Sequence, residues 1–350
     1  MGIELTGRDA RRLRWQSQLL GGSDLSPAGV VRRAVALQGQ DLPAVLQAIA
    51  IRSRPGTTVQ DVRGAFDRGD LVRSWPMRGT LFATTPQFLG VLLAFTAGRI
   101  RAMAARRRAE LGLDETVISS ARETLRQALQ ERPLLRSGAM ELWEDAGIST
   151  ADGRGYHLLM HLAVEGLVHW GPFTPDGTQQ QHLVLSEPHH PGEPDAALAE
   201  VVRSFVLARG PVTEADLAWW TKLPKTMVRR AAAAAGDLVE VRVDGAPAWM
   251  VGEPPVPAQS GVTLVPGFDE WILGYADRSL AASPAMLAAL VPGNNGIFRP
   301  AVLVDGVVVG TWRWPRTSRL AREPVLEMVE PVSPATLRRI KQALADWPHR

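Results

Sequence analysis

Three times along the chain, a group of short helical segments is followed by two short apolar segments with a turn between them. In the first group, helical patterns cover residues 13–20, 26–37, 43–52 and 58–68, and residues 71–84 have the character of extended chain. A few helices followed by a β-ribbon are typical of a winged-helix unit. This order limits the choice of folds more than any single segment does.

The pattern returns in the middle of the chain, and again after a polar link rich in proline and histidine at residues 187–195. In the middle copy, Pro175-Asp176-Gly177 marks the turn between the strands. In the third copy, Asp244-Gly245 marks a hairpin after the clearest helix-turn-helix of the sequence. The segments are 114–131, 156–166, 168–173 and 182–186 in the middle copy, and 196–209, 212–220, 224–235, 238–243 and 248–251 in the third.

Beyond residue 261 the chain becomes β-rich. Strand-like segments cover residues 262–265, 297–304, 307–312 and 325–328, with a hairpin signal at Asp305-Gly306. A closing helix is predicted over residues 333–347. We therefore predict a mainly α fold with β wings, an α+β chain of three tandem winged-helix units followed by a β-rich part. The predicted divisions are 1–108, 109–190, 191–255 and 256–350.

Length and composition limit the setting in which the chain works. The 350 residues are too many for one small core. Cysteine is absent, which excludes disulfides and thiolate metal sites. No segment has the length and apolar character expected of a bilayer span, and residues 1–12 are too polar for a signal peptide. We expect a monomer in the cytoplasm that makes no membrane contact and is associated with the nucleoid when bound to DNA.

The charge is unevenly distributed. Residues 1–108 contain 17 Arg, no Lys and 7 acidic residues, whereas the rest of the chain has 22 basic and 29 acidic residues. A basic region on an acidic body is typical of a surface that binds a polyanion. The alternative is an ordinary solvated surface with many arginines.

Gln38 and Gln40 form the most informative motif, in the segment Leu37-Gln38-Gly39-Gln40-Asp41. On a regular helix, residues two apart point about 200° away from each other. Gly39 interrupts the helix and Asp41 can cap the next one, so the pair is predicted at a helix–helix junction. Extended geometry there places both side chains on one side, where two carboxamides can hold a water molecule. The alternative is a capping or turn cluster.

Four segments in the same order resemble the AlkZ/YcaQ group of winged-helix DNA glycosylases. Residues 36–41 resemble the Gln-x-Gln signature of the AlkZ proteins. The related YcaQ proteins carry Asp in place of the second Gln. The other three segments resemble a wing, a C-terminal signature and a last hairpin of the family. They are residues 73–81 (RSWPMRGTL), 264–278 (LVPGFDEWILGYADR) and 304–313 (VDGVVVGTWR).

The resemblance implies three tandem winged helices in a C-shaped clamp, with no cofactor and no metal. Members of the family excise alkylated purines, including N7-alkylguanine and interstrand crosslinks, in base-excision repair or in protection of a producer from its own genotoxic product. It implies that Gln38 and Gln40 are catalytic, with Asp41 and Asp269 as support. Gly39 departs from the family's usual aliphatic residue, which predicts a looser junction.

The expected partner is double-stranded DNA that carries an alkylated purine. Arg73, Trp75 and Arg78 in the first wing, and Arg299 and Arg313 near the last hairpin, are the predicted DNA contacts. For the first three, the alternative is a packed wing with two solvated arginines.

The chemistry predicted from these residues is monofunctional. N7-alkylguanine is a good leaving group, so the enzyme needs mainly to position water and stabilise an oxocarbenium-like transition state. Glutamine is no base at neutral pH, and its role is orientation and dipole stabilisation. A bifunctional glycosylase needs an amine nucleophile, and residues 1–221 contain no lysine.

Other patterns favour structural roles. His157, His161 and Glu165 share a helix face, but the HExxH glutamate is missing, so a packed face is the favoured interpretation over a metal site. For the possible acid pair Asp269 and Glu270, a structural role in a salt bridge or turn is favoured over catalysis.

Two other classes of protein are alternatives to a glycosylase. The alternative function is a non-catalytic winged-helix DNA-binding protein or transcription regulator, which has no need for the glutamine pair. A nuclease is disfavoured because the sequence shows no acidic metal cluster.

Overall fold

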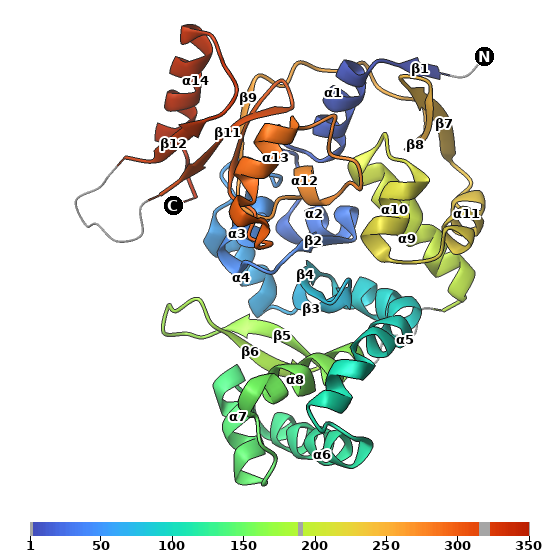
Figure 1. Ribbon diagram of the computed structural model, residues 1–350, viewed down its shortest axis with the longest axis vertical. Helices are drawn as coiled ribbons and strands as arrows, with labels where there is room; N and C mark the ends of the chain where they lie inside the picture. The colour runs from blue at the N-terminus through green and yellow to red at the C-terminus, as the bar shows by residue number, and fades with distance from the viewer. Residues whose placement is uncertain (1–2, 188–191, 315–322, 350) are drawn as a thin grey trace.

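A computed structural model describes residues 3–187, 192–314 and 323–349 (Figure 1). The first half contains β1 (Ile3–Leu5), α1 (Gly7–Ser17), α2 (Pro27–Ala34), β2 (Ala36–Gln38), α3 (Leu42–Ala50), α4 (Val59–Asp67), β3 (Val72–Met77), β4 (Thr80–Thr84), α5 (Pro86–Glu110), α6 (Glu115–Glu131), α7 (Arg136–Asp145), α8 (Arg154–Val164), β5 (Val168–Phe173) and β6 (Gln181–Leu185). The second half contains α9 (Pro194–Arg209), α10 (Glu214–Thr221), α11 (Lys225–Ala234), β7 (Leu238–Val243), β8 (Ala246–Val251), β9 (Val262–Val265), α12 (Glu270–Leu273), α13 (Pro284–Leu290), β10 (Ala301–Val304), β11 (Val307–Arg313), β12 (Val325–Met328) and α14 (Pro334–Ala345).

A five-stranded sheet of order β2-β4-β3-β5-β6 joins the first two predicted units. β3 pairs with β4 and also with β5, where Arg73 lies opposite Trp170. The sheet therefore crosses the boundary predicted at residue 108, and the division into units stays a prediction.

The long helix α5 was not predicted from the sequence. Thr85 caps its first turn, and Pro86 follows the cap. By length and composition α5 could cross a membrane, so the prediction that no such segment exists was wrong; 39% of its apolar window is buried inside the protein. Leu89 and Leu93 pack on Val72 of β3, as in the core helix of a folded domain. Figure 1 shows α5 running from the sheet to the α6–α8 helices.

The N-terminal strand belongs to the sheet of the third predicted unit. β1 pairs parallel with β7, with Ile3 opposite Val241, and β7 forms a hairpin with β8. Asp244, in the turn of that hairpin, accepts a hydrogen bond from the Gly7 backbone at 3.0 Å. The start of the chain is thereby attached about 240 residues away in sequence, which no local pattern predicts.

The C-terminal part contains an antiparallel sheet of order β12-β11-β10-β9. The predicted hairpin around Asp305-Gly306 is confirmed, and β10 begins at Ala301, later than predicted. Trp347, after α14, packs on Trp312 of β11 with ring centroids 4.9 Å apart. In Figure 1 this sheet and α14 lie at the side of the molecule opposite the β7–β8 hairpin.

Residues 36–38 are a strand rather than the end of a helix. α2 begins with Ser26 as its N-cap and Pro27 in its first turn, as predicted, but it ends at Ala34. Val35 then has a φ of 66°, a conformation that a β-branched residue adopts only under tertiary constraint. The backbone turns there into β2, which pairs antiparallel with β4 and places Gln38 opposite Phe82.

Candidate active site

Gln38 is the last residue of β2, and Gln40 lies in the turn before α3. Asp41 caps α3 by accepting a hydrogen bond from the Ala44 backbone at 3.0 Å, so its predicted capping role is confirmed. Gln38 is buried, whereas Gln40 is exposed. The extended geometry predicted for the pair is present as far as Gln38, in a strand between the two helices, and Gln40 lies in the bend that follows.

The two carboxamides are held differently. The side-chain oxygen of Gln40 accepts a hydrogen bond from the Leu81 backbone at 3.3 Å, which leaves its amide group free to donate elsewhere. The side-chain oxygen of Gln38 is buried and accepts no hydrogen bond from any described residue. Buried polar atoms in native proteins are nearly always paired, and an orphaned one needs a reason. Gln38 therefore offers an acceptor and Gln40 a donor.

The backbone between the glutamines is held at Gly39 from two sides. Its amide donates to the Leu81 carbonyl at 2.8 Å, and its carbonyl accepts from Arg73 Nε at 2.8 Å. A second nitrogen of Arg73 donates to Gln181 Oε1 at 3.1 Å. Burial lowers the pKa of Arg73 to about 10, so it stays charged at neutral pH. Arg73 is thus partly buried and holds the backbone of the glutamine turn, and the DNA contact that we predicted for it stays a prediction.

Gly39 tightens the turn instead of loosening it. A Cβ atom at this position would lie 3.0 Å from the Ala83 backbone nitrogen and 3.1 Å from the Phe82 carbonyl carbon. Such contacts are with backbone atoms of β4, which the sheet holds in place. The predicted looser junction was therefore wrong, because glycine permits the close approach of two backbones.

Three buried residues that the sequence analysis did not place in the site lie at or next to β2. Glu270 accepts a hydrogen bond from the Gln38 backbone at 3.1 Å and forms an ion pair of 2.9 Å with Arg209. Trp220 donates from its indole nitrogen to the same carboxylate at 3.1 Å. The acidic pair at 269–270 was visible in the sequence, but nothing there showed which strand it approaches.

Asp269 lies directly before Glu270, at the start of α12. It caps α12 through the Trp271 backbone and forms two hydrogen bonds, 2.8 and 2.9 Å long, with Arg52. Arg52 also donates to Gln18. The salt-bridge role predicted for Asp269 and Glu270 is confirmed, and each acid pairs with a different arginine.

Two predicted DNA contacts lie in packed surroundings. Trp75 is 2% exposed and packs against Tyr156 and Trp170 in the core, so it does not present a surface to DNA. Arg78 is half-buried, stacks over Phe82 and Trp219, and has its pKa lowered to about 10 by burial. The interpretation of two solvated arginines on a packed wing is wrong for Arg73 and Arg78, since both are partly buried.

Cations nevertheless gather near Arg78. Lys222 and Arg278 lie over the same Trp219 ring as Arg78, at 5.5 and 5.4 Å from its centroid. Arg313 is exposed at the end of β11, and Arg299 forms an exposed ion pair with Glu327 at 2.9 Å. Positive charge is thus present at Arg313 and in this cation cluster.

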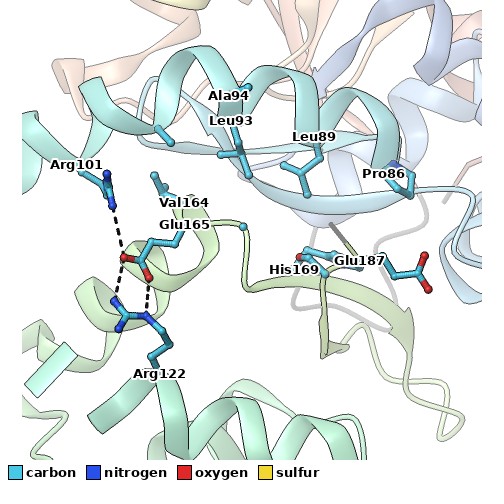
Figure 2. Close-up of a pocket in the computed structure, with 14 residues that line it drawn as sticks. Pro86, Leu89, Leu93, Ala94, Arg101, Arg122, Val164, Glu165, His169 and Glu187 are labelled. Carbon is cyan, nitrogen blue, oxygen red and sulfur yellow. Dashed lines mark hydrogen bonds and ion pairs between the residues drawn. The ribbon is translucent and has the colours of Figure 1, made fainter. Parts of the chain in front are cut away.

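A groove of about 750 Å³ lies between α5 and the α8–β5 region, away from the glutamines. Figure 2 shows Arg101 and Arg122 converging on Glu165, with Leu89 and Leu93 along the wall. Burial alone would raise the pKa of Glu165, but hydrogen bonds from His161 and Arg122 lower it to about 2. Glu165 thus forms an ion pair with Arg122 and a hydrogen bond with His161, and the described residues contain no group suited to hold a metal.

Comparison with known proteins agrees with this fold. A model of the AlkZ-like DNA glycosylase family matches residues 31–349. The chain is 30% identical over 129 residues to an interstrand DNA cross-link repair glycosylase of Streptomyces sahachiroi, an alignment that spans 34% of this chain and about a third (35%) of the relative. The fold is similar to that of the Streptomyces sahachiroi DNA glycosylase AlkZ, with a TM-score of 0.80 and 22% identity over 99% of this chain and 97% of that one.

Proposed function

The chain belongs to the AlkZ-like family of DNA glycosylases, and we propose that it hydrolyses the N-glycosidic bond of N7-alkylated guanine in double-stranded DNA. The family resemblance predicted from the sequence is confirmed. The observation that carries the proposed chemistry is the buried, unpartnered oxygen of Gln38, two residues from a second carboxamide whose orientation is fixed.

The reaction suits a pair of neutral amides. N7-alkylguanine carries a positive charge, and breakage of the C1′–N9 bond returns the bonding electrons to the base and leaves it neutral. The water oxygen forms a bond to C1′, and its proton passes to solvent. What the protein must supply is an oriented water and a negative dipole near the oxocarbenium-like carbon.

The structure supports different roles for the two glutamines. We propose that the Gln38 oxygen accepts a hydrogen bond from the attacking water and points its dipole at C1′. The amide of Gln40, whose oxygen is occupied by Leu81, donates to the water or to the substrate. Because Arg73, Leu81 and Glu270 hold the backbone of this turn, little reorganisation is needed at the moment of reaction.

We further propose that three winged-helix units form a clamp around the duplex and that the protein acts as a monomer on DNA in the cytoplasm. Arg313 and the cations around Trp219 are the proposed phosphate contacts. Substrates include interstrand crosslinks, as the name of the Streptomyces relative indicates for that protein. The activity serves base-excision repair or protects a cell from its own genotoxic product.

The test is excision from a duplex that carries N7-methylguanine, measured as free base and as alkali-labile sites. We expect wild-type protein to release the base. Gln38→Ala and Gln40→Ala should each slow release by at least ~10-fold, since a positioned group contributes on the order of 10²–10⁴ to a step, while DNA affinity changes little. Full activity in the double variant would remove the glutamines from the mechanism. Tight binding to one sequence without excision would favour a regulator.

A further inference from the structure

One edge of the strand that carries Gln38 has no neighbouring strand. β2 lies at the end of its sheet and pairs there with β4 alone. The Gly39 amide donates toward β4, to the Leu81 carbonyl. Because backbone groups of successive residues face opposite edges of a strand, the groups of Ala36 and Gln38 face the unpaired edge. Buried backbone groups at such an edge need partners.

The Arg209–Glu270 ion pair supplies those partners. Arg209 donates from its two terminal nitrogens to the carbonyls of Ala34 and Ala36, each at 2.9 Å. Glu270 Oε1 accepts a hydrogen bond from the backbone N–H of Gln38 at 3.1 Å. The donor and the acceptor thus follow each other along the edge of β2 as they would on an adjacent strand.

Burial and several hydrogen bonds fix the position of the Arg209–Glu270 ion pair. The side chains of Arg209 and Glu270 are 1% and 3% exposed. Glu270 Oε2 accepts from Nε and a terminal nitrogen of Arg209, at 3.1 and 2.9 Å, and from Trp220. The Arg209 guanidinium also lies over the Trp220 ring at 4.6 Å. Charged, multiply hydrogen-bonded pairs are the strongest and most directional that proteins make.

We propose that Arg209 and Glu270 replace the missing strand beside β2 and are positioning residues for Gln38. The proposal rests on the proposed glycosylase function. The side-chain oxygen of Gln38 accepts no hydrogen bond from the described residues, so the backbone sets where that oxygen can point. Arg209 ends α9 and Glu270 begins α12, so two distant segments hold the catalytic strand in place.

Glu270→Gln is the sharpest perturbation. The amide has one oxygen, whereas the carboxylate accepts from three donors of Arg209 and Trp220 on one side and from Gln38 on the other. The three donors, two of them charged, outcompete the single amide, so the new side chain turns its oxygen to them. Its NH₂ group then faces the Gln38 N–H, and the edge contact is lost.

Asp216→Asn is the matched control. Asp216 is a buried carboxylate that lies 3.8 Å from Arg14 and accepts from the backbones of Thr213 and Ala276. The substitution makes the same change of charge and shape without touching β2. Any general effect of losing a buried carboxylate should appear in both variants.

The experiment measures amide hydrogen exchange of residues 35–41, single-turnover excision of N7-methylguanine, and the Kd for the duplex. In Glu270→Gln we expect faster exchange in this segment and excision slowed about 10- to 100-fold, as a displacement near 1 Å can cause, with the Kd within about twofold of wild type. Asp216→Asn should keep wild-type exchange there and wild-type excision. Wild-type exchange and excision in Glu270→Gln, or equal losses in both variants, would overturn the proposal.

Arg209→Lys keeps the proposal testable if Glu270→Gln does not fold. A lysine retains a cation beside Glu270, but one ammonium cannot reach the Ala34 and Ala36 carbonyls together with the carboxylate. We expect faster exchange of residues 35–41 and slower excision, and unchanged behaviour would contradict the assignment. If wild-type protein excises nothing, the proposed function fails, and the exchange measurement alone decides whether the ion pair holds the strand.

Discussion

Replacing Arg73 by methionine should impair excision without weakening the electrostatic part of DNA binding. The guanidinium donates to the Gly39 carbonyl and to Gln181, and methionine keeps most of the side-chain length but neither hydrogen bond. From the sequence we predicted the opposite for Arg73: a phosphate contact whose loss would lower the salt dependence of binding. The variant therefore separates the two roles.

The magnitude follows from the contacts. Two charge-assisted hydrogen bonds contribute about 1.5–3 kcal/mol each, or about 3–6 kcal/mol together. The lowering of the Arg73 pKa from 12.5 to about 10 reflects a desolvation penalty of about 3 kcal/mol. The difference leaves a net loss of stability on substitution of at most about 3 kcal/mol. Release of the Gly39 carbonyl should slow excision about 10- to 100-fold, because small displacements of positioned groups have effects of that order.

The assay combines thermal unfolding, single-turnover excision and salt titration of duplex binding. Arg63→Met is the matched control, since Arg63 stacks on Phe173 and donates to Thr178 and should leave excision unchanged. In Arg73→Met, the slope of log K against log salt should equal that of wild type. If instead the slope falls by about 0.9, the value for one phosphate, while excision stays normal, Arg73 is a DNA contact and our description of the site is wrong.

Three other results are expected. Borohydride should trap no covalent enzyme–DNA adduct, because residues 1–221 contain no lysine and the proposed nucleophile is water; a trapped adduct would indicate an amine nucleophile. If the protein neutralises roughly 4–6 phosphates, binding should weaken with a salt slope of about −4 to −5, and Arg313→Ala should reduce that slope by about one unit on every duplex tested. Arg299→Ala, whose side chain pairs with Glu327, should reduce it less. Glu165→Gln should destabilise the protein at pH 7, where the lowered pKa of Glu165, about 2 against an ordinary 4.5, adds stability. That difference should shrink as the pH falls below 4.5, and a difference that is constant down to pH 3 in urea unfolding would show that the charge is not the cause.

Local signals predicted much of the secondary structure and the position of the glutamine pair. Ser26-Pro27, Asp41 and Asp305-Gly306 begin or join elements where their short-range chemistry favours it. Helix α5 was missed because its apolar residues follow no single stripe: one part packs under the sheet and another toward the α8 region. The end of α2 was misplaced because residues 36–38 have helix-compatible side chains, and pairing with β4 decides their conformation.

By itself, the sequence determined the family and drew attention to the glutamine motif, because residue types and their order carry that information directly. Only the tertiary structure decided what surrounds the motif. It placed Trp75 in the core, turned Arg73 toward the Gly39 carbonyl, and brought Arg209 and Glu270 to the free edge of β2. The physical reason is that a charged side chain has the same local sequence signature whether it meets solvent, phosphate or a backbone carbonyl, and the choice depends on segments that are distant along the chain.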